Sequence, residues 1–398
     1  MTIQHQSSDV QAAAPARAAF YNDPTVRAIF WQVVVCGAVL ALIGYLVSNA
    51  LDNLARQNIA SGFAFLDLPA GFAIGEGMID YDPSNTYLRA IVLGVLNTIK
   101  VAVAGIIFAT IIGVIVGVAR LSPNWLVARF ATVYIEALRN VPLLLQLFFW
   151  YALLVEALPI AREAYGPIMG FYLSNRGLNV PLPDDIGFVF PLVGLLLAIA
   201  GSVWLYRRNK RIHDATGETP NTIVPVLIML VVFPFLGWVA GGFPTAFDTP
   251  ELKGFSFNGG GVVSAEFMAL WLGLTLYTAS FIAEIVRSGI QAVTKGQWEA
   301  AGALGLRRGQ ILRFVVLPQA LRVIIPPTTS QYLNLTKNSS LAVAIGYPDI
   351  VSIAGTTLNQ TGQAIEGIAI IMAVYLTLSL SISAFMNWYN KKIALVDR

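Results

Sequence analysis

The chain has 398 residues, of which 56% are hydrophobic and only 12% are charged, and its formal net charge is +3 at pH 7. Soluble domains carry about 25% charged residues, so this composition excludes an ordinary soluble protein and indicates an all-α, polytopic membrane protein. The small positive charge does not indicate nucleic-acid binding, because the basic residues lie at the ends of apolar stretches. Cys36 has no partner for a disulfide within the chain, and no residue spacing suggests a metal site.

Residues 1–27 are polar and are predicted to form a cytoplasmic N-terminal tail, since they lack the basic-then-apolar layout of a cleaved signal peptide. The apolar run that follows is expected to span the membrane as a retained helix, because about 20 apolar residues cross a bilayer core. In chain order, the stretches predicted to cross the membrane are 28–50, 89–118, 126–157, 186–206, 222–241, 264–289, 315–345 and 366–389.

The distribution of lysine and arginine predicts which side of the membrane each loop faces. If the N-terminus is cytoplasmic, the cytoplasmic segments hold most of these residues, and the opposite side holds only Arg56, Arg89, Arg162, Arg176 and Lys253. This asymmetry follows the positive-inside rule. Both termini and the segment 297–318 are therefore expected in the cytoplasm.

Three segments on the predicted outer side, 66–85, 158–185 and 242–263, are long and rich in turn-forming residues. Two interpretations stay open for them: they become ordered against a partner, or they simply link helices. The second is the default expectation.

The cytoplasmic segment 297–318 reads as two short helices around a glycine. Residues 297–303 favour a helix, Gly305 can supply the left-handed conformation that ends it, and a second helix can begin at Arg308. The small residues 300–303 form a ridge that another protein can approach closely, and Glu299 suits the helix N-terminus or a partner's cation. Two interpretations remain: an interfacial amphipathic helix, or a helix that docks into a groove of another protein.

Within this segment, Glu299, Ala300, Ala301 and Gly305, followed by Leu317-Pro318, resemble the EAA loop of ABC importer membrane subunits. In that family this short cytoplasmic helix seats in a groove of the ATPase subunit and transmits its closure. The resemblance implies a coupling helix at 296–313, whose ATPase-coupling residues are Glu299, Ala300, Ala301, Gly302, Gly305 and Leu306.

Other segments, 134–154, 278–306 and 335–350, are similar to polar amino-acid permeases. The extra first helix and the long stretch 158–263 depart from the minimal five-helix permease and resemble the larger permease of the general L-amino-acid importers. The resemblance implies a type I ABC importer permease core of five helices plus extra helices. The implied parts are an N-terminal tail 1–27, an extra helix and periplasmic loop 28–88, core helices 89–157, inserted loops with two extra helices 158–263, a second core part with the coupling helix 264–390, and a cytoplasmic tail 391–398.

The resemblance further implies a subunit of an ATP-driven importer in the bacterial inner membrane that moves L-amino acids, of polar or general specificity, from periplasm to cytoplasm. The implied partners are a dimer of ATPase subunits, a second homologous permease in a heterodimer, a periplasmic amino-acid-binding protein and membrane lipid. The chain lacks the Gly-x-x-x-x-Gly-Lys-[Ser/Thr] pattern of a P-loop. No catalytic residue or cofactor is therefore expected in it, and ATP and Mg are expected on the partner ATPase.

Polar residues inside a span are costly and indicate function by default. The strongest cluster surrounds Lys337, whose ammonium group can bind the carboxylate of an amino acid, and its run of Asn and Ser favours a helix break that lines a cavity. Snorkelling of Lys337 and helix–helix hydrogen bonding are the alternative. The predicted substrate path comprises Lys337, Asn338, Ser339, Ser340, Asn334, Thr336, Lys100 and Gln146.

Two pairs of opposite charge stand three residues apart in predicted helices, a spacing at which ion pairs form. They are Glu136 with Arg139, before Pro142, and Glu284 with Arg287, near the cytoplasmic end of the span 264–289. Both are predicted to be structural or gating ion pairs.

An ion-coupled secondary transporter of amino acids is the alternative function. It would need carboxylates or unwound helices in the membrane to hold Na⁺ or H⁺, and Glu136 and Glu284, each near an arginine, are the only candidates. A membrane-embedded enzyme is a weaker hypothesis, because the spans contain no cluster of His, Asp or Cys. Uptake by this chain without any ATPase would favour the secondary transporter.

Overall fold

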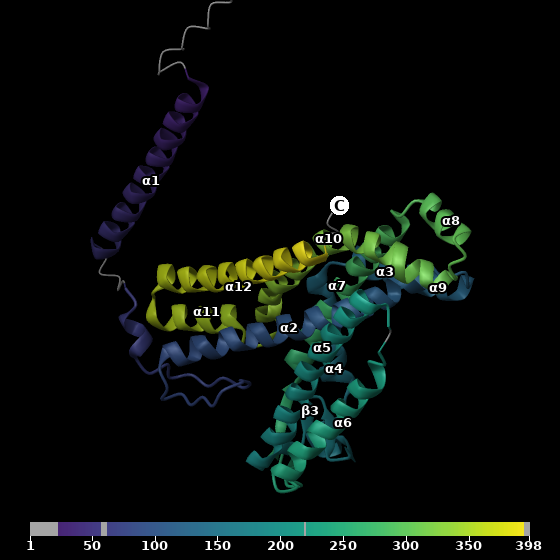
Figure 1. Ribbon diagram of the computed structural model, residues 1–398. Coiled ribbons are helices and arrows are strands. Elements are labelled where there is room, and N and C mark those ends of the chain that lie inside the picture. Colours follow the sequence, from purple (N-terminus) through teal and green to yellow (C-terminus); the bar gives the residue numbers. More distant parts are fainter. Residues whose placement is uncertain (1–22, 57–61, 219, 394–398) are drawn as a thin grey trace, which may run out of the picture.

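The computed structural model describes residues 23–56, 62–218 and 220–393, so the predicted tails 1–27 and 391–398 lie largely outside the described residues. The described part contains seven helices that are long and apolar enough to cross a membrane, and a bent helix pair that counts as an eighth if it is taken as one span. The prediction of a helical membrane protein with about eight spans is therefore confirmed (Figure 1).

The spanning helices are bounded by turn residues and side-chain caps. Thr86, Asn124 and Ser264 accept backbone N–H bonds at the N-termini of three of them, as N-cap residues do. In chain order these helices are α1 (Pro24–Arg56), α2 (Tyr87–Arg120), the pair α3 (Trp125–Asn140) and α4 (Leu143–Ala157), α5 (Val189–Thr216), α6 (Ile223–Ala240), α7 (Ala265–Gln291), α10 (Leu317–Asn338) and α12 (Ala364–Ile393). The shorter helices are α8 (Lys295–Ala303), α9 (Arg308–Ile311) and α11 (Ile350–Thr361).

The centre of the core is the close contact between α2 and α7. A Cβ atom placed on Gly113 would lie 2.7 Å from the Cβ of Ile282, and one placed on Gly117 would lie 2.6 Å from the carbonyl oxygen of Ala283. Small residues at such positions let helix backbones approach closely within a membrane. Helices α4 and α10 contribute to the same buried cluster, so α7 is the element around which the core is built.

Replacing Gly117 by leucine is expected to reduce the yield of folded protein sharply, because the added side chain has no space beside Ala283. Overpacking of this kind costs about 1–3 kcal/mol, and more where the obstacle is backbone. The measurement is the monodisperse fraction and thermal stability of the chain in detergent. Gly37→Leu on α1 is the matched control, because nothing lies within 4 Å of that position, and an equal loss in both variants would contradict the prediction.

The predicted span 126–157 is not one straight helix. Helices α3 and α4 meet at an angle of 106° around Val141 and Pro142. The side-chain amide of Gln146 donates hydrogen bonds to the carbonyl oxygens of Leu138 (2.8 Å) and Val141 (2.9 Å), which the bend leaves without helical partners. Gln146 is only 5% exposed and stabilises the bend, while its part in the substrate path stays a prediction.

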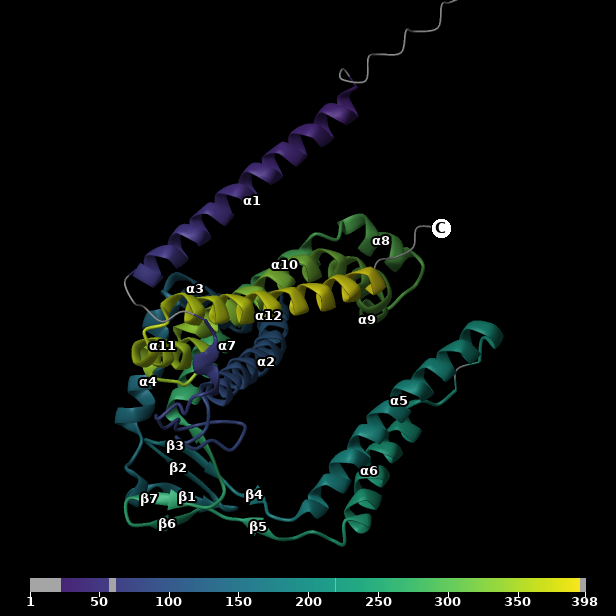
Figure 2. The same ribbon diagram turned by 90° about the vertical axis from the view of Figure 1, so that its left-hand side faces the viewer.

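The inserted outer segments are ordered, contrary to the default expectation of simple linkers. An antiparallel sheet has the strand order β1 (Tyr165–Ile168), β2 (Phe171–Ser174), β3 (Gly177–Val180) and β8 (Gly261–Ser264). Strand β3 precedes the inserted helices and β8 follows them, so their pairing joins the two segments (Figure 2). The strands β4 (Leu182–Pro183) and β5 (Phe247–Asp248) pair next to this sheet, and β6 (Glu251–Lys253) pairs with β7 (Ser256–Asn258).

The extra helix α1 and the hairpin of α5 and α6 stand apart from the bundle of core helices (Figure 2). Helices α5 and α6 pack tightly on each other, since a Cβ on Gly194 would lie 2.3 Å from the carbonyl oxygen of Phe233, and one on Gly237 would lie 2.4 Å from that of Phe190. Helix α5 also continues past the predicted end at residue 206 to Thr216. The pair therefore forms a hairpin of its own, whose far end extends beyond the apolar stretch.

Candidate functional site

The segment that resembles a coupling loop forms helix α8, which ends in a left-handed turn. Gly305 has a φ of +76°, its N–H donates to the carbonyl of Gly302 (2.9 Å), and the N–H of Leu306 donates to that of Ala301 (3.3 Å). These two bonds define a helix end that glycine adopts at the lowest cost. The predicted helix and its glycine stop are both present in the structure.

Helix α8 has two different faces. Glu299, Ala300 and Gly302 are exposed, whereas Ala301 is 3% exposed and belongs to the buried core cluster, against which Leu306 also packs. The expectation that residues 300–303 form one continuous docking ridge is therefore wrong at Ala301. This residue seats the helix on the rest of the protein, because its small side chain allows close contact.

The segment after α8 runs directly into a spanning helix. Helix α9 is followed without a break by a π-helical turn, Leu312–Val316, and then by α10. The side-chain amide of Gln319 on α10 also lies 3.4 Å from the amide oxygen of Gln297 on α8. Helix α8 is therefore linked to the first turns of α10 both through the chain and by this side-chain contact.

A cluster of charges joins two core helices near the end that is predicted to be cytoplasmic. Glu284 on α7 forms ion pairs with Arg287, at 2.5 Å, and with Arg120 at the end of α2. Arg287 also donates to the side-chain oxygen of Gln291 at 2.5 Å. The predicted pair of Glu284 and Arg287 is thus present, and Arg120 is a partner that the sequence analysis missed because it lies on a different span.

The other predicted pair does not form. Within residues 23–56, 62–218 and 220–393, no ion pair joins Glu136 to Arg139, and both side chains are exposed. The guanidinium of Arg139 lies 4.9 Å from the ring centroid of Phe281 on α7. Arg139 is therefore held by an aromatic ring of the neighbouring helix.

The polar cluster on α10 is split between buried and exposed positions. Thr336 and Ser339 are fully buried, and their hydroxyls donate to the carbonyl oxygens of Tyr332 (2.9 Å) and Thr336 (2.7 Å). Asn334 and Lys337 are exposed on the same helix. The predicted residues therefore do not converge on one pocket within this chain.

The helix changes where the run of Asn and Ser predicted a break. Helix α10 ends at Asn338 and continues as a 3₁₀ segment, Ser339–Ile345, which Gly346 closes with a φ of +80°. The hydroxyl of Ser340 donates to the carbonyl oxygen of Lys337 at 2.8 Å. The predicted irregularity is confirmed, and local hydroxyl groups satisfy part of its backbone.

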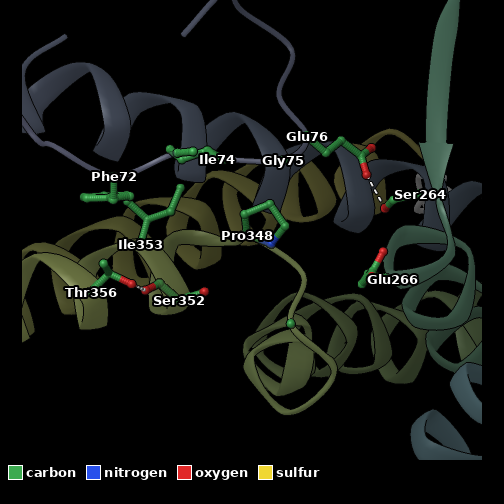
Figure 3. Close-up of a pocket in the computed structure, with 12 residues that line it drawn as sticks. Phe72, Ile74, Gly75, Glu76, Ser264, Glu266, Pro348, Ser352, Ile353 and Thr356 are labelled. Atoms are coloured by element: carbon green, nitrogen blue, oxygen red, sulfur yellow. Dashed lines mark hydrogen bonds between the residues drawn. The ribbon is translucent and has the colours of Figure 1, made fainter. Parts of the chain in front are cut away.

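A cavity of about 330 Å³ lies at the N-terminal end of α7, on the side predicted to be periplasmic. The segment 72–76, the first residues of α7 and the start of α11 line it. Figure 3 shows the apolar side chains of Phe72, Ile74 and Ile353 at one end and the carboxylates of Glu76 and Glu266 at the other. The cavity thus offers an apolar wall and an acidic wall to a small molecule.

Lys100 belongs to the ion network behind this cavity. Its ammonium lies 2.5 Å from a carboxylate oxygen of Glu76 and 4.3 Å from the ring centroid of Phe267. The hydroxyl of Ser264, which also caps α7, donates to the other oxygen of Glu76. Lys100 is thus paired with Glu76, and its predicted part in the substrate path stays a prediction.

Removing Lys100 alone is expected to lower the thermal stability of the chain, because the Glu76 side chain is only 9% exposed and would lose its counter-charge. Breaking a buried pair costs roughly 3 kcal/mol or more, whereas neutralising both partners costs much less. Lys100→Met should therefore be less stable than the double variant Glu76→Gln/Lys100→Met. Thermal unfolding in one detergent measures this, and a double variant no more stable than the single one would contradict it.

Comparison with known proteins identifies the family. Residues 105–395 match the family described as "Binding-protein-dependent transport system inner membrane component". The chain is 51% identical to the General L-amino acid transport system permease protein AapQ of Rhizobium johnstonii, over 96% of each chain. It is 50% identical to the permease protein YhdX of Escherichia coli over the full length of both. It is also 43% identical to the permease protein BztB of Rhodobacter capsulatus, over 97% of this chain and 99% of that one.

The region matched by the family covers most of the helical core of the structure. Residues 105–395 include most of the core helices, the coupling segment α8 and its continuation into α10. The spanning helices make the chain a multi-pass inner-membrane protein and a transport component. The chain belongs to the family of inner-membrane components of binding-protein-dependent transport systems.

Proposed function

We propose that this chain is a permease subunit of an ATP-driven importer that moves L-amino acids, of polar or general specificity, from periplasm to cytoplasm. The observation that carries the proposal is helix α8, whose exposed face includes Glu299 and whose far end runs through the π-helical turn into α10. The relative AapQ is named a general L-amino acid permease, and BztB a glutamate/glutamine/aspartate/asparagine permease. These names support the substrate class.

The proposed cycle needs partners, because a chain without a P-loop has no site to cradle ATP. A dimer of ATPase subunits binds ATP and Mg and holds the exposed face of α8, formed by Glu299, Ala300 and Gly302, in a groove of one subunit. A periplasmic amino-acid-binding protein delivers the substrate on the opposite side. Both termini of the chain lie in the cytoplasm with α8.

A second, homologous permease completes the proposed substrate path as a heterodimer. The exposed positions of Asn334 and Lys337 on α10 support this arrangement, because an exposed lysine inside a span needs a cavity or a partner. The ammonium of Lys337 binds the α-carboxylate of the substrate. Asn338 and Ser340 lie at the break beside it, whereas the buried Thr336 and Ser339 shape the helix.

The charge cluster around Glu284 is proposed to hold the cytoplasmic end of the substrate path closed. It ties the end of α2 to α7 through Arg120 and Arg287, so separation of these helices requires its rearrangement. An ion-coupled transporter would need a carboxylate that is free to take up H⁺ or Na⁺. Glu284 is held by two arginines, which favours the ATP-driven importer.

The proposal is tested by purifying the tagged chain from its native host in a mild detergent and reconstituting it in liposomes. An ATPase and a second permease are expected to co-purify, and uptake of an L-amino acid is expected to require ATP inside and the binding protein outside. Purification of the chain alone, with uptake driven by an ion gradient, would establish the secondary transporter instead.

A further inference from the structure

The cytoplasmic end of the α5–α6 hairpin is strongly basic, and the transport cycle described above makes no use of it. Arg207, Arg208, Lys210 and Arg211 follow the apolar part of α5 directly, and all four side chains are exposed. None of them takes part in an ion pair with any residue that the structure describes. Four lysine and arginine residues directly cytoplasmic of a span form a cluster of the size that binds anionic lipids.

An open surface cavity of about 380 Å³ lies beside this basic end. Among the residues that line it, Tyr206, Lys210 and His213 carry side-chain groups that can donate hydrogen bonds to an oxyanion. The Nδ1 atom of His213 lies 3.2 Å from the carbonyl oxygen of Glu218, so its Nε2 atom stays available. One carboxylate, Asp214, also lines the cavity. Its donors therefore fit a phosphate group.

The residues beside the cavity are those typical of the depth of the lipid headgroups. The apolar part of α5 ends at Trp204 and Tyr206, and the guanidinium of Arg208 lies 5.6 Å from the ring centroid of Trp204. Tryptophan and tyrosine at the end of a span mark the membrane interface. Basic clusters directly cytoplasmic of a span attract anionic lipids. A lipid phosphate can therefore reach this site without leaving the bilayer.

One wall of the cavity comes from a distant part of the chain. Phe314 lies in the π-helical turn between the coupling segment and α10, and it lines the same cavity as the hairpin residues. The guanidinium of Arg313 lies 5.6 Å from the centroid of that ring. An occupant of the cavity therefore touches both the inserted hairpin and the segment that links α8 to α10.

We propose that this cavity binds the phosphate headgroup of an anionic phospholipid of the cytoplasmic leaflet, which joins the α5–α6 hairpin to the coupling segment. Lys210 and His213 hold the phosphate, and the neighbouring arginines supply the surrounding positive potential. The acyl chains extend along the apolar surface of the hairpin. The inserted helices α5 and α6 thereby anchor the coupling segment to lipid of the cytoplasmic leaflet.

The test is a binding measurement that does not depend on transport. The delipidated full chain in neutral detergent is titrated with phosphatidylglycerol, and bound lipid is counted by native mass spectrometry. Phosphatidylglycerol is expected to bind at least about tenfold more tightly than phosphatidylcholine, and Lys210→Gln/Arg211→Gln should remove this preference. The charge-preserving variant Lys210→Arg/Arg211→Lys should retain most of it, which separates loss of charge from misfolding.

The matched control is Lys391→Gln/Lys392→Gln. These two exposed lysines end α12 beside Trp388, with Lys392 at 5.1 Å from its ring centroid, but they do not line the cavity. The control variant is expected to keep the preference for phosphatidylglycerol. If both variants lose the preference for phosphatidylglycerol equally, the effect is a general attraction between basic residues and anionic lipid, and the proposed site is wrong. Displacement of phosphatidylglycerol by millimolar inorganic phosphate would overturn the assignment to a lipid.

Discussion

ATP-driven uptake is expected to be abolished in a transporter whose chain carries Glu299→Lys, while the amount of that chain in the membrane stays normal. Glu299 is exposed on α8, so the substitution leaves the packing of the spans unchanged but reverses the charge offered to the ATPase. A like-charge contact at an interface costs several kcal/mol, which corresponds to a loss of at least about 100-fold. Uptake into liposomes and the amount of co-purified ATPase measure the two expected effects.

Gly305→Asp should give the same loss by a different route. At a φ of +76° an aspartate is strained, so the end of α8 shifts although its exposed face is chemically intact. Glu163→Lys is the control, because this glutamate is exposed in a segment predicted to lie on the outer side, and the same reversal of charge leaves α8 untouched. Wild-type uptake in both α8 variants, with normal complex yield, would disprove the docking role of α8.

Lys337→Met is expected to lower amino-acid uptake by at least about tenfold while the ATPase remains bound. The substitution removes the cation proposed to bind the substrate carboxylate, and a hydrogen bond to a charged group contributes about 1.5–3 kcal/mol. Lys337 is exposed on α10, so the change creates no cavity in the core. The measurement compares initial uptake rates at low substrate concentration with the amount of ATPase recovered with the chain.

Two variants sharpen this test. Lys337→Arg retains the charge and should recover much of the uptake, whereas Lys253→Met removes an exposed lysine of the outer strand β6 and should have no effect. If Lys337→Met transports at the wild-type rate, the lysine only snorkels to the membrane surface, and the substrate path must lie elsewhere.

The spans could be predicted from the sequence because each needs only length and low polarity, although α5 continues to Thr216, well past its predicted end at residue 206. The sharp bend in 126–157 could not, because Pro142 in an apolar run is compatible with a kink as well as with a complete break. The outer strands are too short, at two to four residues, to show an alternating pattern. Their order depends on pairing between β3 and β8, which lie far apart in the chain.

The site residues also divide into those that could be predicted from the sequence and those that could not. Gly305 and the helix before it follow from local conformational preference, and so does the break after Asn338. The partners of Lys100 and Glu284 do not, because Glu76 and Arg120 come from other segments and nothing in their local sequence indicates the contact. Ala301 looks like its neighbour Ala300 in the sequence, and only tertiary packing distinguishes the buried position from the exposed one.

The pairing of β3 with β8 has a topological consequence. Val180 and Gly261 are register partners at the point where the chain leaves for the inserted helices and returns from them. The whole excursion 181–260 therefore begins and ends at adjacent positions, and a short turn joining those positions would close the path between α4 and α7 without altering either helix. The inserted segment 181–260 is therefore a separate structural unit, which can be gained or lost in one step while the core keeps its connectivity.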